Sequence, residues 1–350
     1  MHNSPMTAPY PPIQITFAPA WWHAHYGMIF SENILNDPIA RTEMEREQRR
    51  LLYDRFGDVG LGERDPQPHP CVDGAYGHRF MAALWGCDIT YALDHAPSAI
   101  ALDHPEDRMP RLSMPDVAQS ALVRKFHQDA VTLTRRYGHC DTSVNIGGPL
   151  NNAVSVFGEA ILAACASDPQ LADAVLMAMA RLCLWVDDEL VHAGVAAGVT
   201  RPVGTIGNCP VCMISPGTYQ RVVLPVDQWY RNHYEAFSIH HCGVFHPYRF
   251  VYQALRPNHL DIGFGSDLRL IRAAYPDTNL SLEIQARILR GAALAELDVA
   301  IDALMTAAAP MDKITHLWVA EAGPDVTDDV VRHLITWPLR RTSPPTSQPT

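Results

Sequence analysis

Short runs of β-branched and aromatic residues alternate along this chain with longer amphipathic stretches, and this alternation constrains the fold more than any other feature. It is typical of parallel βα units, in which a helix follows each strand and returns the chain to the same edge of the sheet. Eight candidate strands predict an α/β fold, a (β/α)8 TIM-type barrel with an N-terminal extension. The candidate strands are Ile13–Ala18, Ile89–Leu93, Thr142–Ile146, Arg201–Ile206, Phe237–His241, Leu260–Gly265, Asn279–Ile284 and His316–Ala320.

Three of the intervening helices have recognisable start signals. Asp168 supplies an N-cap for an apolar-periodic helix over Pro169–Ala193, whose proline suits the first turn. Ser215 does the same for a helix running toward Tyr234, and Thr327 caps the last helix. The helices are therefore expected between the strands, as a barrel requires.

The length of 350 residues is compatible with one elaborated barrel domain. We expect that domain to span residues 13–338. Residues 1–12 and 339–350 are rich in proline and polar residues, which predicts a disordered tail at each end.

The net charge of −11 argues against a nucleic-acid partner, because phosphate recognition needs a basic surface. The longest apolar stretches carry charges, so no membrane span is expected, and the N-terminus lacks the pattern of a secretory signal. We therefore expect a cytoplasmic protein. In that reducing compartment its eight cysteines would be packing residues, metal ligands or nucleophiles rather than disulfides.

His240 and Cys242 stand where the apolar run Phe237–His241 gives way to a loop. Side chains alternate faces in an extended segment, so these two would point the same way and His241 the opposite way. An imidazole and a thiolate are a candidate pair of zinc ligands. The alternative is a buried histidine and a free cysteine at the end of a core strand.

Other reactive residues also follow predicted strands, and the carboxyl ends of barrel strands form the rim where active sites lie. His23 and His25 would share a face if extended, as ligands or proton donors, or they belong to an amphipathic plug at the barrel mouth. Cys209 and Cys212 have the spacing of a zinc knuckle or a redox dithiol. They either join the cavity of His240 and Cys242 or are spectators beside the next helix, and we favour spectators.

Residues 143–243 contain a series of short motifs. They are Gly148-Pro149 before a helix, Asp168-Pro169, Ile214-Ser215-Pro216 ahead of Leu224-Pro225, and His240-x-Cys242-Gly243. In these motifs the chain resembles the uroporphyrinogen decarboxylase superfamily, and the resemblance extends more weakly to the end of the chain. There, Glu321-x-x-Pro324-x-x-Thr327 is similar to the Cys-x-x-Pro-x-x-Thr-Pro element of that family.

The resemblance separates two kinds of chemistry. The porphyrinogen decarboxylases hold their substrate with an N-terminal arginine cluster, which the corresponding stretch Trp22–Tyr26 lacks. In the zinc-dependent, corrinoid-linked methyltransferases, a His-x-Cys pair and a later cysteine bind zinc. Here Glu321 stands in the place of that later cysteine, so the resemblance implies His240, Cys242 and Glu321 as ligands of Zn²⁺ or another divalent metal.

The expected function is a metal-dependent methyltransferase that moves a methyl group between a corrinoid and a small, thiol-bearing substrate. Methylcobalamin would be the co-substrate, arriving free or on a separate corrinoid carrier protein. His23, His25 and Asn208 are the candidate catalytic residues. The alternatives are a metal-assisted lyase or decarboxylase acting on a small carboxylate and, third, a non-enzymatic metal-binding protein.

Overall fold

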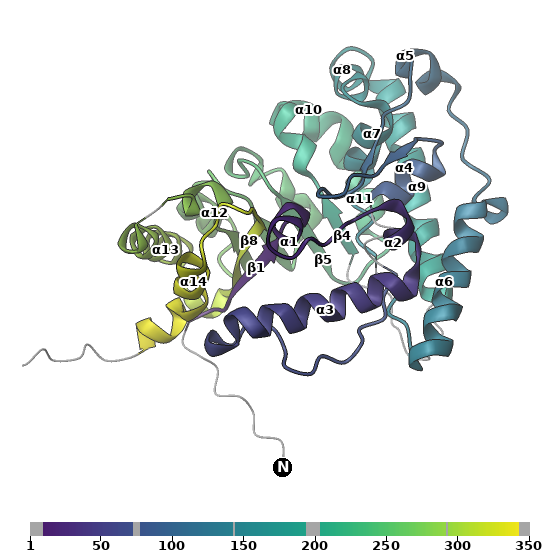
Figure 1. Cartoon of the computed structure of the whole chain (residues 1–350). Helices are drawn as coiled ribbons and strands as arrows, with labels where there is room; N and C mark the ends of the chain where they lie inside the picture. The colour runs from purple at the N-terminus through teal and green to yellow at the C-terminus, as the bar shows by residue number, and fades with distance from the viewer. Residues whose placement is uncertain (1–9, 73–77, 143, 194–203, 292, 343–350) are drawn as a thin grey trace, which may run out of the picture.

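Six strands form one parallel sheet in the order β1-β8-β7-β6-β5-β4, so that the first and last strands of the chain pair with each other. The computed structural model describes residues 10–72, 78–142, 144–193, 204–291 and 293–342. Figure 1 shows the sheet inside a shell of helices, the arrangement expected of an α/β barrel. The strands are β1 (Ile13–Phe17), β4 (Gly204–Gly207), β5 (Phe237–His241), β6 (His259–Ile262), β7 (Asn279–Glu283) and β8 (Ile314–Ala322).

Two predicted barrel strands are wrong within the described residues. The Ile89–Leu93 segment contributes only β2 (Ile89–Thr90), which pairs antiparallel with β3 (Ser98–Ala99) outside the main sheet. Leu93, the last residue of the predicted strand, is 54% exposed, so it is not part of a buried sheet. Residues 144–146 form no strand, because the Asn145 side chain accepts a hydrogen bond from the Gly147 amide and turns the chain. Among the described residues the barrel-type sheet is therefore not closed between β1 and β4.

The predicted helix starts are confirmed. The Asp168 carboxylate accepts from the Leu171 amide at 3.1 Å, and the Ser215 hydroxyl accepts from the Thr218 amide at 3.0 Å. The helices are α1 (Pro19–Tyr26), α2 (Glu32–Asn36), α3 (Pro38–Phe56), α4 (His78–Leu84), α5 (Pro105–Arg108), α6 (Ala121–Tyr137), α7 (Pro149–Phe157), α8 (Ala160–Ser167), α9 (Pro169–Ala193), α10 (Pro216–Thr218), α11 (Leu224–Arg231), α12 (Leu268–Ala274), α13 (Leu294–Ala308) and α14 (Asp328–Thr342), with a π-helical turn (Tyr219–Val223) joining α10 to α11.

The predicted C-terminal tail includes residues that belong to the last helix. Helix α14 continues through Pro338 to Thr342, whereas we expected disorder from residue 339. Its last turn is held to α13 by ion pairs from Arg340 to Asp298 at 2.8 Å and from Arg341 to Asp302 at 2.5 Å. Residues 343–350 and most of the predicted N-terminal tail lie outside the described residues.

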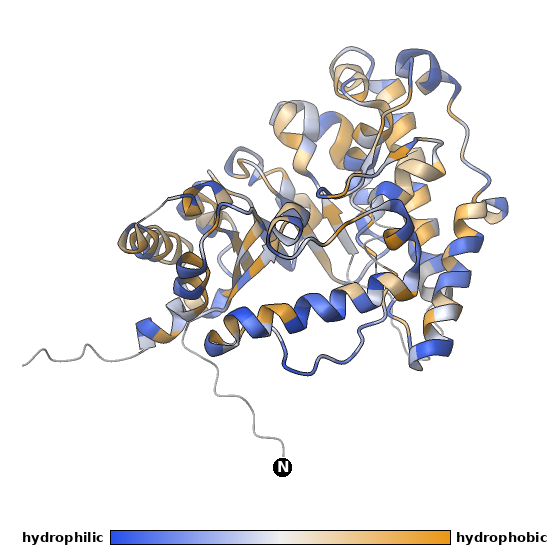
Figure 2. Cartoon of the chain, in the orientation of Figure 1, coloured by the Kyte–Doolittle hydropathy of each residue, from blue (hydrophilic) through white to orange (hydrophobic). Residues whose placement is uncertain are grey.

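The core is apolar and lies between the sheet and its helices, while α3 is largely hydrophilic along its length (Figure 2). Among the described helices, α9 is long and apolar enough by composition to cross a membrane, and 44% of that stretch is buried inside the protein. Leu176, Leu182 and Val186 of α9 are among its buried residues, so they belong to the core.

The two faces of the strands differ in polarity. In β5, Phe237, Ile239 and His241 are buried, whereas Ser238 and His240 are half-buried on the opposite, inner face. Polar side chains of β6 alternate with buried leucine and isoleucine in the same way. The inner face of the sheet is therefore polar, and the end of β5 brings His240 to its carboxyl-terminal edge.

The start of β4 has no room for a side chain. A Cβ atom at Gly204 would lie 2.4 Å from Cγ of Tyr234, whose ring is restrained because its hydroxyl donates to Asp187. We predict that Gly204→Ala lowers the free energy of unfolding by about 1–3 kcal/mol through overpacking. Urea denaturation measures this loss.

Gly207→Ala is the matched control in the same strand, because its Cβ would meet nothing closer than 3.5 Å. Equal stability losses in the two variants would contradict the packing described for the start of β4.

Candidate metal centre

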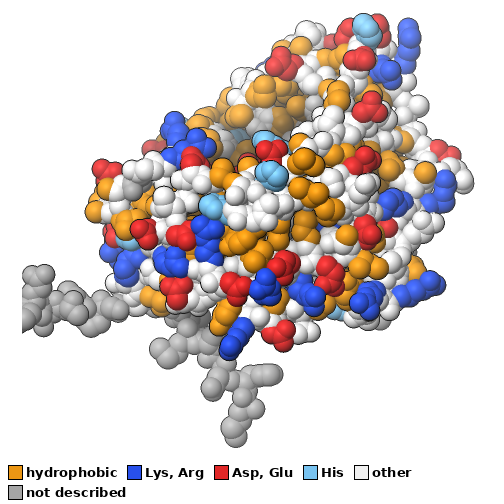
Figure 3. All heavy atoms as spheres, viewed as in Figure 1, with side chains coloured by type: hydrophobic (Ala, Val, Ile, Leu, Met, Phe, Trp, Pro, Cys, Tyr) orange, Lys and Arg blue, Asp and Glu red, His pale blue; other side chains and the backbone are white. Residues whose placement is uncertain are grey.

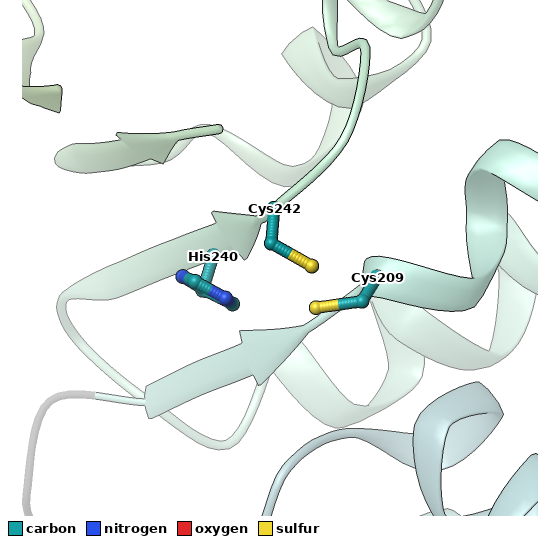
Figure 4. A group of neighbouring side chains, drawn as sticks. All are labelled: Cys209, His240 and Cys242. Carbon is teal, nitrogen blue, oxygen red and sulfur yellow. The ribbon is translucent and has the colours of Figure 1, made fainter. Parts of the chain in front are cut away.

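Three side chains converge at the carboxyl ends of β4 and β5. The Sγ atoms of Cys209 and Cys242 and a ring nitrogen of His240 all lie within 4.8 Å of one another, and all three residues are half-buried. Figure 4 shows the two sulfur atoms pointing toward each other with the imidazole beside them. Tetrahedral zinc separates its ligand atoms by roughly 3.3–3.8 Å, given bonds of about 2.0–2.3 Å, so this group fits such an ion.

The register between β4 and β5 places the third donor. Gly207 pairs with His240, and the next amide, that of Asn208, donates to the His240 carbonyl at 2.8 Å. The ladder thus continues one residue past the strand, and Cys209 follows directly at the start of a short 3-10 turn. Cys209 and Cys242 are therefore brought together by the backbone of two neighbouring strands.

Asp261 orients the imidazole of His240. One Asp261 carboxylate oxygen lies 2.7 Å from Nδ1 of His240, and the other accepts from the Trp318 indole at 2.6 Å. A carboxylate on Nδ1 favours the proton there and leaves Nε2 free as a donor to a metal. Asp261 was not among the residues predicted from sequence, although it stands on the inner face of the next strand, directly opposite His240.

The group is electrostatically suited to a cation. The pKa of Cys209 is lowered, chiefly by hydrogen bonding from the Cys242 thiol and despite burial, while the same contact raises the pKa of Cys242. Burial opposes protonation of His240, but hydrogen bonds to Asp261 and Cys209 outweigh it and raise its pKa to about 10. The thiolate form of Cys209 is therefore favoured, which is the form in which a cysteine binds a metal ion.

Asn208 lies behind the metal-ligand group rather than in it. Its side chain is fully buried, and it donates to Asp227 at 3.0 Å. Tyr219 donates to the same Asp227 oxygen at 2.6 Å, and burial raises the pKa of this carboxyl to about 6. The Asn208 side chain thus anchors the turn that carries Cys209, while its catalytic role stays a prediction.

Glu283 is the second acidic residue that sequence reasoning missed. It ends β7 and is half-buried, and its carboxylate accepts from the Phe264 amide at 3.2 Å. Burial raises its pKa, while the charge of His240 acts in the opposite direction. Glu283 lies two residues after Ser281 in the same strand, so the alternation of side chains places both on the inner face. This alternation is the sequence signal that could have identified Glu283.

Glu321 is not brought into the group by the structure. It is exposed, and its φ of 54° places it in the left-handed region. The pairing of β8 with β1 shifts between Ile15 and Phe17, so one extra residue is accommodated in β8 near Glu321. This irregularity interrupts the alternation that would direct Glu321 inward, and the third residue beside His240 and Cys242 is Cys209.

His23 and His25 both lie in helix α1, so the extended segment in which they would share a face is not formed. Nδ1 of His23 lies 3.0 Å from the Met28 carbonyl oxygen. The ring of His25 lies beside that of Trp21, and the side chain is largely exposed. Partial burial is the main cause that lowers the pKa of His25, and the positive charge of Arg55 is the second. Neither histidine belongs to the group formed by Cys209, His240 and Cys242.

The two cysteines of the Cys-x-x-Cys segment have different environments, so the expectation that both are spectators is corrected for one of them. Cys209 joins His240 and Cys242, whereas Cys212 is exposed and its thiol donates to the Cys209 carbonyl at 3.0 Å. The sequence spacing alone could not separate them, because the difference depends on the register of β4 against β5.

No protein-family model and no curated protein matches this chain. Among solved structures, a methyltransferase from Methanosarcina mazei matches with a TM-score of 0.68 and 13% identity, covering 97% of this chain and 96% of that one. This similarity shows a shared fold, and it confirms the expected TIM-barrel-like α/β architecture.

Two further structures align at lower TM-scores. They are a putative B12-independent methionine synthase from Listeria monocytogenes (TM-score 0.45, 13% identity, 94% of this chain and 100% of that one) and a B12-independent methionine synthase from Shewanella sp. W3-18-1 (0.46, 11%, 94% and 96%). At these scores we draw no argument from them.

The backbone of Cys242 is packed directly against Gly263. A Cβ atom there would lie 2.2 Å from the Cys242 carbonyl carbon, and the Gly263 amide donates to the His241 carbonyl at 2.8 Å. We predict that Gly263→Ala displaces Cys242 and weakens Zn²⁺ binding at least tenfold, because ligand atoms must lie within a few tenths of an ångström of their places. Competition titration with a chromogenic chelator measures the affinity.

Gly217→Ala is the control, since its Cβ would meet nothing closer than the end of the Arg221 side chain, at 3.5 Å. If Gly263→Ala bound zinc as tightly as the control, Cys242 would not be a ligand held by this packing.

Proposed function

We propose that Cys209, His240 and Cys242 hold a divalent metal, zinc by the nature of the donors, and leave one coordination position for substrate. The observation that carries this proposal is the convergence of two thiols and one imidazole nitrogen within 4.8 Å. Three protein ligands with an open fourth position are the pattern of a catalytic zinc site, whereas structural sites have four.

We further propose that the protein transfers a methyl group to the sulfur of a small thiol substrate. Bound at this position, zinc would lower the pKa of a thiol so that the thiolate, the better nucleophile, is present at neutral pH. Asp261 holds the His240 ring in place through its bond to Nδ1. The fold shared with the Methanosarcina mazei methyltransferase supports this class of reaction.

The proposed methyl donor is a corrinoid, methylcobalamin in its simplest form, free or on a separate carrier protein. In the reaction a carbon–cobalt bond breaks, a carbon–sulfur bond forms, and the thiol proton is released to solvent. Exposed apolar side chains stand on the loops that follow β4, β5 and β6, namely Met213, Val244 and Phe264. Such a rim supports contact with a large, partly apolar donor.

The choice between Cys209 and Glu321 is tested by metal content. We predict about one zinc per purified chain, with most of it lost in Cys209→Ser, because a catalytic site has few ligands to spare. Glu321→Ala and Cys212→Ser should keep their zinc, since neither residue lies in the group. Elemental analysis of the four proteins decides the point.

Loss of zinc from Glu321→Ala but not from Cys209→Ser would contradict this ligand set and restore the one expected from sequence. Since thiols and imidazole must lose protons to bind metal, zinc affinity should also fall as the pH is lowered.

Methyl transfer is tested with methylcobalamin and 2-mercaptoethanol under anaerobic conditions. We predict that the protein demethylates methylcobalamin and produces the methyl thioether, and the visible spectrum of the corrinoid measures the rate. This rate should be reduced at least 100-fold in Cys242→Ala because the bound metal is lost. Cys212→Ser is the matched control and should retain activity. His23→Ala should keep its metal and act, if at all, through substrate binding.

Two results would contradict methyl transfer. Zinc-dependent carbon dioxide release from a small carboxylic acid, reduced by roughly 10²–10⁴-fold in His23→Ala or His25→Ala, would indicate the lyase or decarboxylase alternative. Stoichiometric zinc without turnover of any methyl donor and thiol would indicate a metal-binding protein.

A further inference from the structure

A cavity of about 410 Å³ lies among α2, α3, Cys71 and the segment that holds Ala96 and Pro97. This volume is in the range of small-molecule sites. Much of its wall is apolar, with Phe30, Leu35 and Met44 among the residues that line it. Helix α3, which crosses the lower part of Figure 1, provides one side of this cavity, and none of the metal-ligand group lines it.

Arg41 places a buried positive charge in this apolar wall. The residue is 7% exposed, and its guanidinium donates to the Leu35 carbonyl at 2.6 Å and to the Cys71 carbonyl at 3.2 Å. A guanidinium has five N–H donors, and Nε of Arg41 has no hydrogen-bond partner. Both partners that it does have are neutral backbone groups.

The acidic residue in the wall does not neutralise Arg41. Glu45 lies one helical turn further along α3, but its carboxylate is directed to Arg49 at 3.6 Å and to His69 at 3.8 Å. Across the described ranges of the chain, no carboxylate forms an ion pair with Arg41. Charged side chains of both signs along the outer side of α3 are seen at the lower edge of Figure 3, whereas Arg41 is turned inward.

A buried charge without a counter-ion is costly, and a bound anion removes that cost. Arginine matches a carboxylate in both charge and planar geometry. We propose that this cavity binds a small molecule with an apolar body and a carboxylate head, the head lying against Arg41 and the body against Phe30, Leu35 and Met44. The site is separate from the metal centre, so this inference does not rest on the proposed function.

Isothermal titration of the purified protein with octanoate tests the proposal, with octyltrimethylammonium as the probe of opposite charge. The wild-type protein is expected to bind one octanoate per chain and to show no binding of the ammonium compound. Arg41→Met should weaken octanoate binding at least tenfold. Arg46→Met is the matched control, since Arg46 is an exposed arginine of the same helix, paired with Glu43.

Arg41 also holds two backbone segments together, so a variant that leaves it intact is needed. Met44→Trp would fill the cavity with apolar volume and is expected to abolish octanoate binding while zinc content is unchanged. Equal octanoate affinity in Arg41→Met and wild type, equal binding of the two probes, undiminished binding in Met44→Trp, or no binding of octanoate to the wild type would each overturn the proposal.

Discussion

The hydrogen bond from the Asn208 amide to the His240 carbonyl, 2.8 Å long, is the contact on which the candidate centre depends. It extends the parallel ladder of β4 and β5 by one residue and so fixes where the chain turns away from the sheet. Cys209 is the first residue after that point. Had the ladder ended one residue earlier or later, the alternation of side chains would direct the thiol away from Cys242.

The buried polar network below this turn explains why the ladder ends there. Asn208 and Tyr219 both donate to Asp227, which is fully buried. Buried polar groups are stable only when they are paired, so the Asn208 side chain is held down while its neighbour Cys209 is left at the rim. Tyr252 packs edge-on against Tyr219 of this network, with ring centroids 5.1 Å apart, and its hydroxyl lies 3.0 Å from the His241 ring, which fixes β5 from behind. The metal-ligand side chains thus project from a rigid support.

The sequence was sufficient where the signal is local. Strand β5 has the predicted bounds, and alternation along it placed His240 and Cys242 on one side. Hydrogen-bonding caps at Asp168 and Ser215 also lie where composition puts them.

The failures concern relations between distant segments. The role of Cys209 depends on strand register, and the exclusion of Glu321 depends on a local irregularity in the pairing of β8 with β1, neither of which is encoded in spacing. No strand forms in the described part of the predicted strand Thr142–Ile146, where the Asn145 side chain satisfies the Gly147 amide locally and competes with a ladder. Asp261 was overlooked because its contact with His240 depends on the pairing of β6 with β5.

The central claim is the identity of the three donors, and X-ray absorption at the zinc edge of the purified protein tests it most directly. The structure predicts two sulfur scatterers at about 2.3 Å and one imidazole nitrogen at about 2.0–2.1 Å. In the small fraction of Cys209→Ser protein that retains zinc, the spectrum should lose one sulfur and keep the nitrogen. A spectrum of the wild-type protein with a single sulfur and additional oxygen ligands would contradict it and favour Glu321 as the third donor.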